Sequence, residues 1–92
     1  MIKSFAPKGL EIFHRTGKTT GVQAMHAGRL RLILTLLESA KKATDMDAPG
    51  LSLHPLKGDR KGIWAVTVQA NWRVTFHFPD GDPEIVNYED YH

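Results

Sequence analysis

The chain has 92 residues, and this length fits one small domain with a single core over residues 1–92. It contains no cysteine, which excludes disulfides, thiolate metal sites and a cysteine nucleophile. No apolar run approaches the roughly 20 residues that a membrane-spanning helix needs, and the N-terminus lacks the pattern of a signal peptide. We therefore expect a soluble cytoplasmic protein.

Charge is distributed unevenly along the chain, although the net value is only +2. Residues 1–44 carry eight Lys or Arg and two Asp or Glu, whereas residues 45–92 carry four and eight. A basic half is typical of a protein with an anionic partner such as nucleic acid. The alternative is an ordinary solvated helical surface.

The first half of the chain predicts two helices. Residues 1–5 fit a short edge strand, a proline then suits the start of a helix over residues 7–16, and Gly17 is a typical stop. The segment that begins at Thr20 matches a capping box, which predicts a longer helix over residues 21–42. Its apolar stripe is wide enough to cover a sheet and contains Met25, Leu30, Leu32, Ile33, Leu34, Leu36 and Leu37.

After a loop at residues 43–52, two runs of strict alternation predict half-buried strands over residues 62–69 and 72–78. The turn between them is short enough for a hairpin, with Asn71 able to take a left-handed conformation. Residues 84–89 predict a third strand, and we expect all three to be adjacent and antiparallel. The apolar face would carry Trp64, Val66, Val68, Trp72, Val74, Phe76 and Phe78, and the polar face Ala65, Thr67, Gln69, Arg73, Thr75 and His77.

Several motifs carry a resemblance to a known family, namely His54-Pro55-Leu56-Lys57-Gly58-Asp59-Arg60, Trp64, Asn71-Trp72-Arg73 and Tyr88-Glu89-Asp90-Tyr91-His92. At this spacing, over essentially the whole chain, the sequence resembles the HigB toxins of bacterial toxin–antitoxin pairs, within the wider RelE-like group. The resemblance implies an α+β fold, with two N-terminal helices packed on a small, mostly antiparallel sheet. Many relatives carry an arginine in the first hairpin strand, and this chain departs from them, because residues 66–69 hold none.

The resemblance also implies a function. The chain would be an endoribonuclease that cleaves mRNA in the ribosomal A site, needs no metal or other cofactor, and inhibits translation. Its partners would be the ribosome, mRNA and a helix-turn-helix antitoxin of the HigA type, with DNA contacted only through the antitoxin complex.

The candidate site residues suit cleavage of RNA by its own 2′-hydroxyl, which needs proton transfer and stabilisation of charge on phosphorus. The candidate catalytic residues are His54, Lys57, Arg73, Asp90, Tyr91 and His92. Candidate RNA contacts are Lys57, Arg60, Lys61, Asn71 and Arg73. Candidate contacts to ribosomal RNA, here called the basic group, are Arg29, Arg31, Lys41 and Lys42.

Lysine and arginine suit phosphate, imidazole suits acid–base work near neutral pH, and a tyrosine can stack on a splayed base. Each residue also has a structural interpretation, such as an ion pair of Arg73 with Asp59 or Glu89. We assign no role to His14 or His26. A three-histidine metal site from His54, His77 and His92 with Asp90 matches no known zinc spacing. The remaining alternative is a binding module or an inactive toxin homologue, which the missing strand arginine favours.

Overall fold

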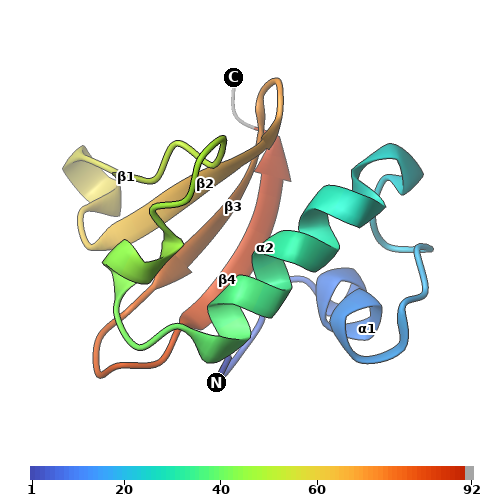
Figure 1. Ribbon diagram of the computed structural model, residues 1–92, viewed down its shortest axis with the longest axis horizontal. Helices are drawn as coiled ribbons and strands as arrows, with labels where there is room; N and C mark the ends of the chain where they lie inside the picture. The colour runs from blue at the N-terminus through green and yellow to red at the C-terminus, as the bar shows by residue number, and fades with distance from the viewer. Residues whose placement is uncertain (91–92) are drawn as a thin grey trace.

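The computed structural model describes residues 1–90 and consists of two helices and a four-stranded antiparallel sheet. The strands lie in the order β1 (His54–Pro55), β2 (Ile63–Gln69), β3 (Trp72–His77) and β4 (Glu84–Asp90). Figure 1 shows α2 crossing one face of the sheet with α1 beside it. The predicted fold class is therefore confirmed, and so is the antiparallel order of the three main strands.

The first helix, α1 (Lys8–Thr16), begins and ends close to its predicted bounds. Pro7 is its N-cap, and Gly17 ends it with a left-handed φ of 82°. That conformation lets the Gly17 amide donate back to the carbonyl of Phe13, and glycine adopts it without a steric cost.

The second helix was predicted over residues 21–42, but α2 is shorter and spans Ala27–Ser39, after a 3-10 turn at Ala24–His26. The capping box at Thr20 is therefore wrong. A backbone contact explains the late start: a Cβ atom on Gly21 would lie 2.4 Å from the Cα of Gly9, so residue 21 passes against α1 before the helix begins. The helix ends early because Ala40 is extended.

The hydrophobic core lies between α2 and the sheet face predicted to be apolar. Trp64 is opposite Phe76 and Val66 opposite Val74, whereas Thr67 and Arg73 pair on the other face. The core gathers buried residues of both layers, including Leu30, Ile33, Leu34, Leu37, Val66, Val74 and Phe76. Arg73 therefore lies on the face away from the helices, as the alternation predicts.

Two local features differ from the sequence interpretation. In the β2–β3 turn, Ala70 takes the left-handed conformation with φ of 52°, and Asn71 does not. The edge strand predicted for residues 1–5 is reduced to one parallel bridge between Phe5 and Val86, with backbone hydrogen bonds on either side of it. Within residues 1–90, no helix is long and apolar enough to cross a membrane.

Candidate active site

His54 and Arg73 meet on the polar face of the sheet, on β1 and β3. The His54 Nδ1 atom is 2.8 Å from the carbonyl oxygen of Ser52, and Arg73 Nη1 is 3.3 Å from His54 Nε2. Because a carbonyl only accepts and a guanidinium only donates, both contacts fit a neutral imidazole protonated at Nδ1. The lone pair on Nε2 then accepts a hydrogen bond from the Arg73 guanidinium.

The backbone of Ser52, whose carbonyl oxygen contacts His54, has an unusual conformation. Its φ is 53°, in the left-handed region that a side chain with a Cβ rarely adopts. Strain of this kind persists where the surrounding structure holds it, and it often occurs at functional sites. Here it accompanies the carbonyl that fixes the tautomer of His54. Sequence reasoning missed Ser52, because nothing in the sequence marks a serine with positive φ.

Small side chains form the floor beneath these groups. Ala65 is opposite His54 on one side and Thr75 on the other, and both Ala65 and Thr75 are buried. A larger residue in this row would fill the space over the sheet. The alternation of β2 and β3 therefore creates room for long cationic side chains above the polar face.

Arg60 is tied to β4. Its guanidinium forms a two-armed ion pair with Glu89, with Nη1–Oε1 and Nη2–Oε2 distances of 2.5 and 3.1 Å. Asn87 Nδ2 donates to the same carboxylate at 3.1 Å. Arg60 belongs to a 3-10 turn, η3 (Gly58–Arg60), so the pair anchors this turn to the far side of the sheet. The sequence suggested Glu89 as a partner for Arg73, and it did not indicate the pair with Arg60.

An open hollow of about 320 Å³ joins these elements. Its lining is His54, Pro55, Leu56, Lys57, Arg60 and Arg73. Lys57 is exposed and stands just before η3. Lys57, Arg73 and the His54 imidazole border one hollow, with Arg60 held beside them by Glu89, and such a surface fits an anion such as a phosphate.

The other predicted site residues lie around this hollow or apart from it. Asp90 is exposed at the end of β4, opposite Trp72, so the alternation of the strand places it on the face of Trp72, whereas Glu89 is the residue opposite Arg73. Asn71 is exposed in the neighbouring turn. Lys61 lines a second hollow on the other side of η3. Tyr91 and His92 lie outside the described residues.

The basic group divides into exposed and engaged cations. Arg31, Lys41 and Lys42 are exposed. The side chain of Arg29 is partly buried, and its guanidinium donates to the carbonyl of Gly50. Arg29 therefore also has a structural role, in holding the loop after α2. Within residues 1–90, no three His, Asp or Glu side chains lie close enough to share a metal ion.

His26 and Tyr88 connect the start of α2 to the sheet next to Asp90. His26 is buried, and its Nδ1 atom is 2.5 Å from the Tyr88 hydroxyl. The Trp72 and Tyr88 rings stack with centroids 4.6 Å apart. Burial raises the pKa of the Tyr88 phenol above its ordinary value. The cluster fixes the end of β4, from which Asp90 extends.

Comparison with known proteins shows which family the chain belongs to. Residues 3–92 match the model of a HigB-like toxin family, described as the RelE-like toxin of the type II toxin–antitoxin system HigB. The chain is 48% identical over 92 residues to Endoribonuclease HigB of Proteus vulgaris, with the full length of both chains covered. The crystal structure of a YafQ mutant from E. coli shares the fold with a TM-score of 0.60 at 19% identity, covering 98% of this chain and 91% of that one. The chain belongs to the HigB-like family of RelE-like toxins of type II toxin–antitoxin systems.

Proposed function

We propose that this chain is an endoribonuclease that cleaves mRNA in the ribosomal A site and thereby inhibits translation in the cytoplasm. The contact between Arg73 and His54, beside Lys57 at one hollow, carries the proposal. It joins phosphate-binding cations to an imidazole with a defined acceptor atom. The relative named Endoribonuclease HigB, at 48% identity, supports the same activity.

The proposed reaction needs no metal ion. The 2′-hydroxyl of the substrate loses its proton to an acceptor such as His54 Nε2, which becomes available when Arg73 turns from it to the phosphate, and the 2′-oxygen forms a bond to the neighbouring phosphorus. The bond from phosphorus to the 5′-oxygen then breaks, and an acid delivers a proton to that oxygen. The products are a 2′,3′-cyclic phosphate and a free 5′-hydroxyl, so atoms and charge balance.

Charge on phosphorus rises in the transition state, and pre-placed cations are the main way to lower its energy. Lys57 and Arg73, which both line the hollow, provide such cations. Asp90 ends the last strand and Tyr91 and His92 come after it in the sequence, and we assign the proton donor to this group. Lys61 and Asn71 would extend the RNA contact away from the cleaved bond.

Membership of a type II toxin–antitoxin family implies an antitoxin partner. We propose that this partner is a small helix-turn-helix protein of the HigA type and that DNA is bound only through the complex. The basic group would hold the toxin on ribosomal RNA, chiefly through the exposed side chains of Arg31, Lys41 and Lys42.

A non-catalytic ribosome-binding module is the second candidate, because residues 66–69 lack the arginine expected in the first hairpin strand. Single-turnover cleavage on programmed ribosomes separates the two. We expect cleavage within the A-site codon, no cleavage of naked mRNA, and none when the attacking 2′-hydroxyl is replaced by hydrogen. Binding to ribosomes without cleavage would establish the binding module instead.

A further inference from the structure

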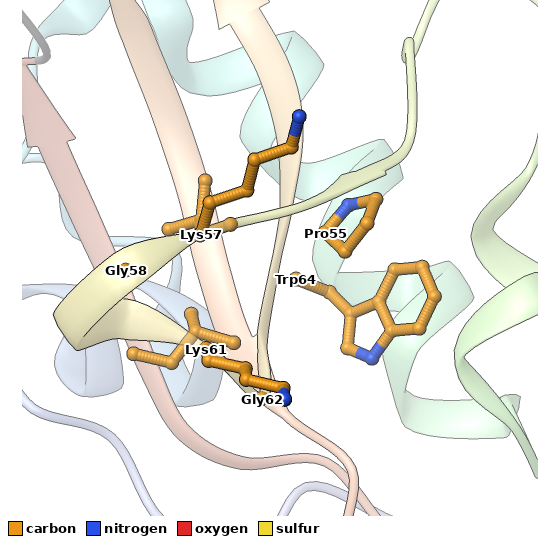
Figure 2. A pocket seen from close by; sticks show the side chains of 8 residues that line it. Pro55, Lys57, Gly58, Lys61, Gly62 and Trp64 are labelled. Carbon is orange, nitrogen blue, oxygen red and sulfur yellow. The ribbon is translucent and has the colours of Figure 1, made fainter.

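A second hollow, of about 340 Å³, lies beside the one that holds His54 and Arg73. Its main lining residues are Pro55, Leu56, Lys57, Lys61, Ile63 and Trp64. Pro55 and Trp64 are register partners on β1 and β2, and Figure 2 shows their rings side by side. The two lysines stand at the two ends of η3. This hollow therefore joins flat apolar rings to two cations.

The size and chemistry of the hollow fit one nucleotide. A volume of 340 Å³ is at the small end of ligand pockets. Aromatic rings stack with unpaired bases of single-stranded RNA, and lysines neutralise the backbone phosphates. Among residues 1–90, no acidic side chain lines the hollow. Trp64 packs against the core with part of its surface and lines the hollow with another part.

The two hollows are continuous along one segment of the chain. Residues 55–57 line both, so Lys57 stands between a phosphate-sized site and an apolar one. Trp64 and Arg73 lie on opposite faces of the sheet, so a nucleic acid strand that places a phosphate beside Arg73 reaches the second hollow by passing around the edge strand β1 at Lys57. The nearness of the two hollows argues for the same RNA as the occupant of both.

We infer that the second hollow is a nucleotide subsite, in which a base next to the cleaved bond stacks on Trp64 and Pro55 while Lys57 and Lys61 face its phosphate. This inference rests on the proposed function. It assigns substrate binding to Trp64, Pro55 and the apolar side of the β1–η3 segment. It also gives Lys61 a defined task that is separate from the reaction itself.

The test measures single-turnover cleavage on programmed ribosomes as the toxin concentration is varied. Each variant is assayed on normal mRNA and on mRNA with an abasic nucleotide on the 5′ or the 3′ side of the cleaved bond. On normal mRNA, Trp64→Ala should raise the half-saturating concentration about tenfold, with little change in the maximal rate, because base stacking is lost. Trp64→Phe should recover most of that loss.

The abasic substrates separate stacking from folding. If Trp64 stacks on a base, Trp64→Ala and the parent should differ by less than about twofold on one of the two abasic mRNAs, because the stacking partner is already absent. A purely structural defect would weaken cleavage equally on all three substrates. Lys61→Gln should raise the half-saturating concentration about two- to fourfold and reduce its salt dependence, whereas the exposed Lys18→Gln on another face should not.

Three results would overturn the inference. One is equal loss for Trp64→Ala on normal and on both abasic mRNAs. Another is unchanged cleavage by Trp64→Ala together with weaker antitoxin binding, which would make the hollow a protein-docking site. The third is a parent protein that binds ribosomes and cuts nothing, which rejects the proposed function itself and is recognised without any Trp64 variant.

Discussion

Arg73 gives the sharpest test of the candidate site. Arg73→Ala removes the guanidinium 3.3 Å from His54 Nε2 and one of three cations around the hollow. Arg73 projects from the polar face of β3, away from the core, so the core that covers the opposite face stays intact. The substitution therefore changes the charge of the site and the environment of His54 more than the fold.

The expected loss follows from the role of a pre-placed donor. Removing one donor that stabilises transition-state charge typically costs about 3–4 kcal/mol, or about 10²- to 10³-fold in rate. Arg73→Lys keeps the charge but loses the planar fork that fits phosphate, so its rate should lie between those of Arg73→Ala and the parent. The assay is the rate of single-turnover cleavage at saturating toxin, with the urea midpoint measured in parallel.

Arg15→Ala is the matched control. The Arg15 side chain is 69% exposed on α1 and pairs with Glu11 across one helical turn, a contact that contributes only a few tenths of a kcal/mol. Its rate should equal that of the parent. A rate for Arg73→Ala within about twofold of the parent, with an unchanged urea midpoint, would refute the assignment of Arg73 and of the hollow around it.

Three further predictions concern stability and ribosome binding. Gly21→Ala should lower the free energy of unfolding measured in urea by about 1–3 kcal/mol, because the new Cβ would lie 2.4 Å from the Gly9 Cα. Gly28→Ala should stabilise α2 by about 0.5–1 kcal/mol, because its new Cβ would meet no atom within 4 Å and alanine favours a helix. Burial raises the pKa of the Tyr88 phenol above its ordinary value of about 10, so the neutral phenol stabilises the fold fully below about pH 10. This contribution to the free energy of unfolding is lost as the pH rises through the pKa of the folded state. The urea midpoint of the parent should therefore fall more between about pH 9 and 11 than that of Tyr88→Phe. Neutralising the whole basic group should weaken ribosome binding and flatten its salt dependence, and an unchanged slope would assign these cations to a solvated surface.

The sequence predicts the sheet well because alternation is local. Trp64 and Val66 have to share a face whatever the rest of the chain does, and a short turn joins β2 to β3. The placement of Arg73 on the polar face follows from the same rule. In the order of the strands, β2 lies between the strands of His54 and Arg73. The long Arg73 side chain extends across β2 and contacts His54 Nε2 at 3.3 Å.

Features that depend on distant backbone contacts could not be predicted in this way. Thr20 looks like a helix cap, and only the approach of residue 21 to Gly9 shows why the helix begins later. The ion pair of Arg60 with Glu89 joins residues 29 apart and depends on how η3 folds over the sheet. Local sequence patterns carry no information about such pairs, so the partner of Arg60 appears only in the folded chain.

The pleat of β2 explains why the positive charge of the site comes largely from a loop. Val66 and Val68 are buried in the core, so β2 offers small side chains at Ala65 and Thr67 to the polar face beside Arg73. With no cation on β2, the hollow takes its other charges from Lys57 and from η3, in a segment whose two glycines have left-handed φ values of 66° and 96°. The positions of the Lys57 and Arg60 side chains depend on how firmly η3 is held against the sheet. We therefore expect the ion pair between Arg60 and Glu89, which ties η3 to β4, to help hold this charge in place.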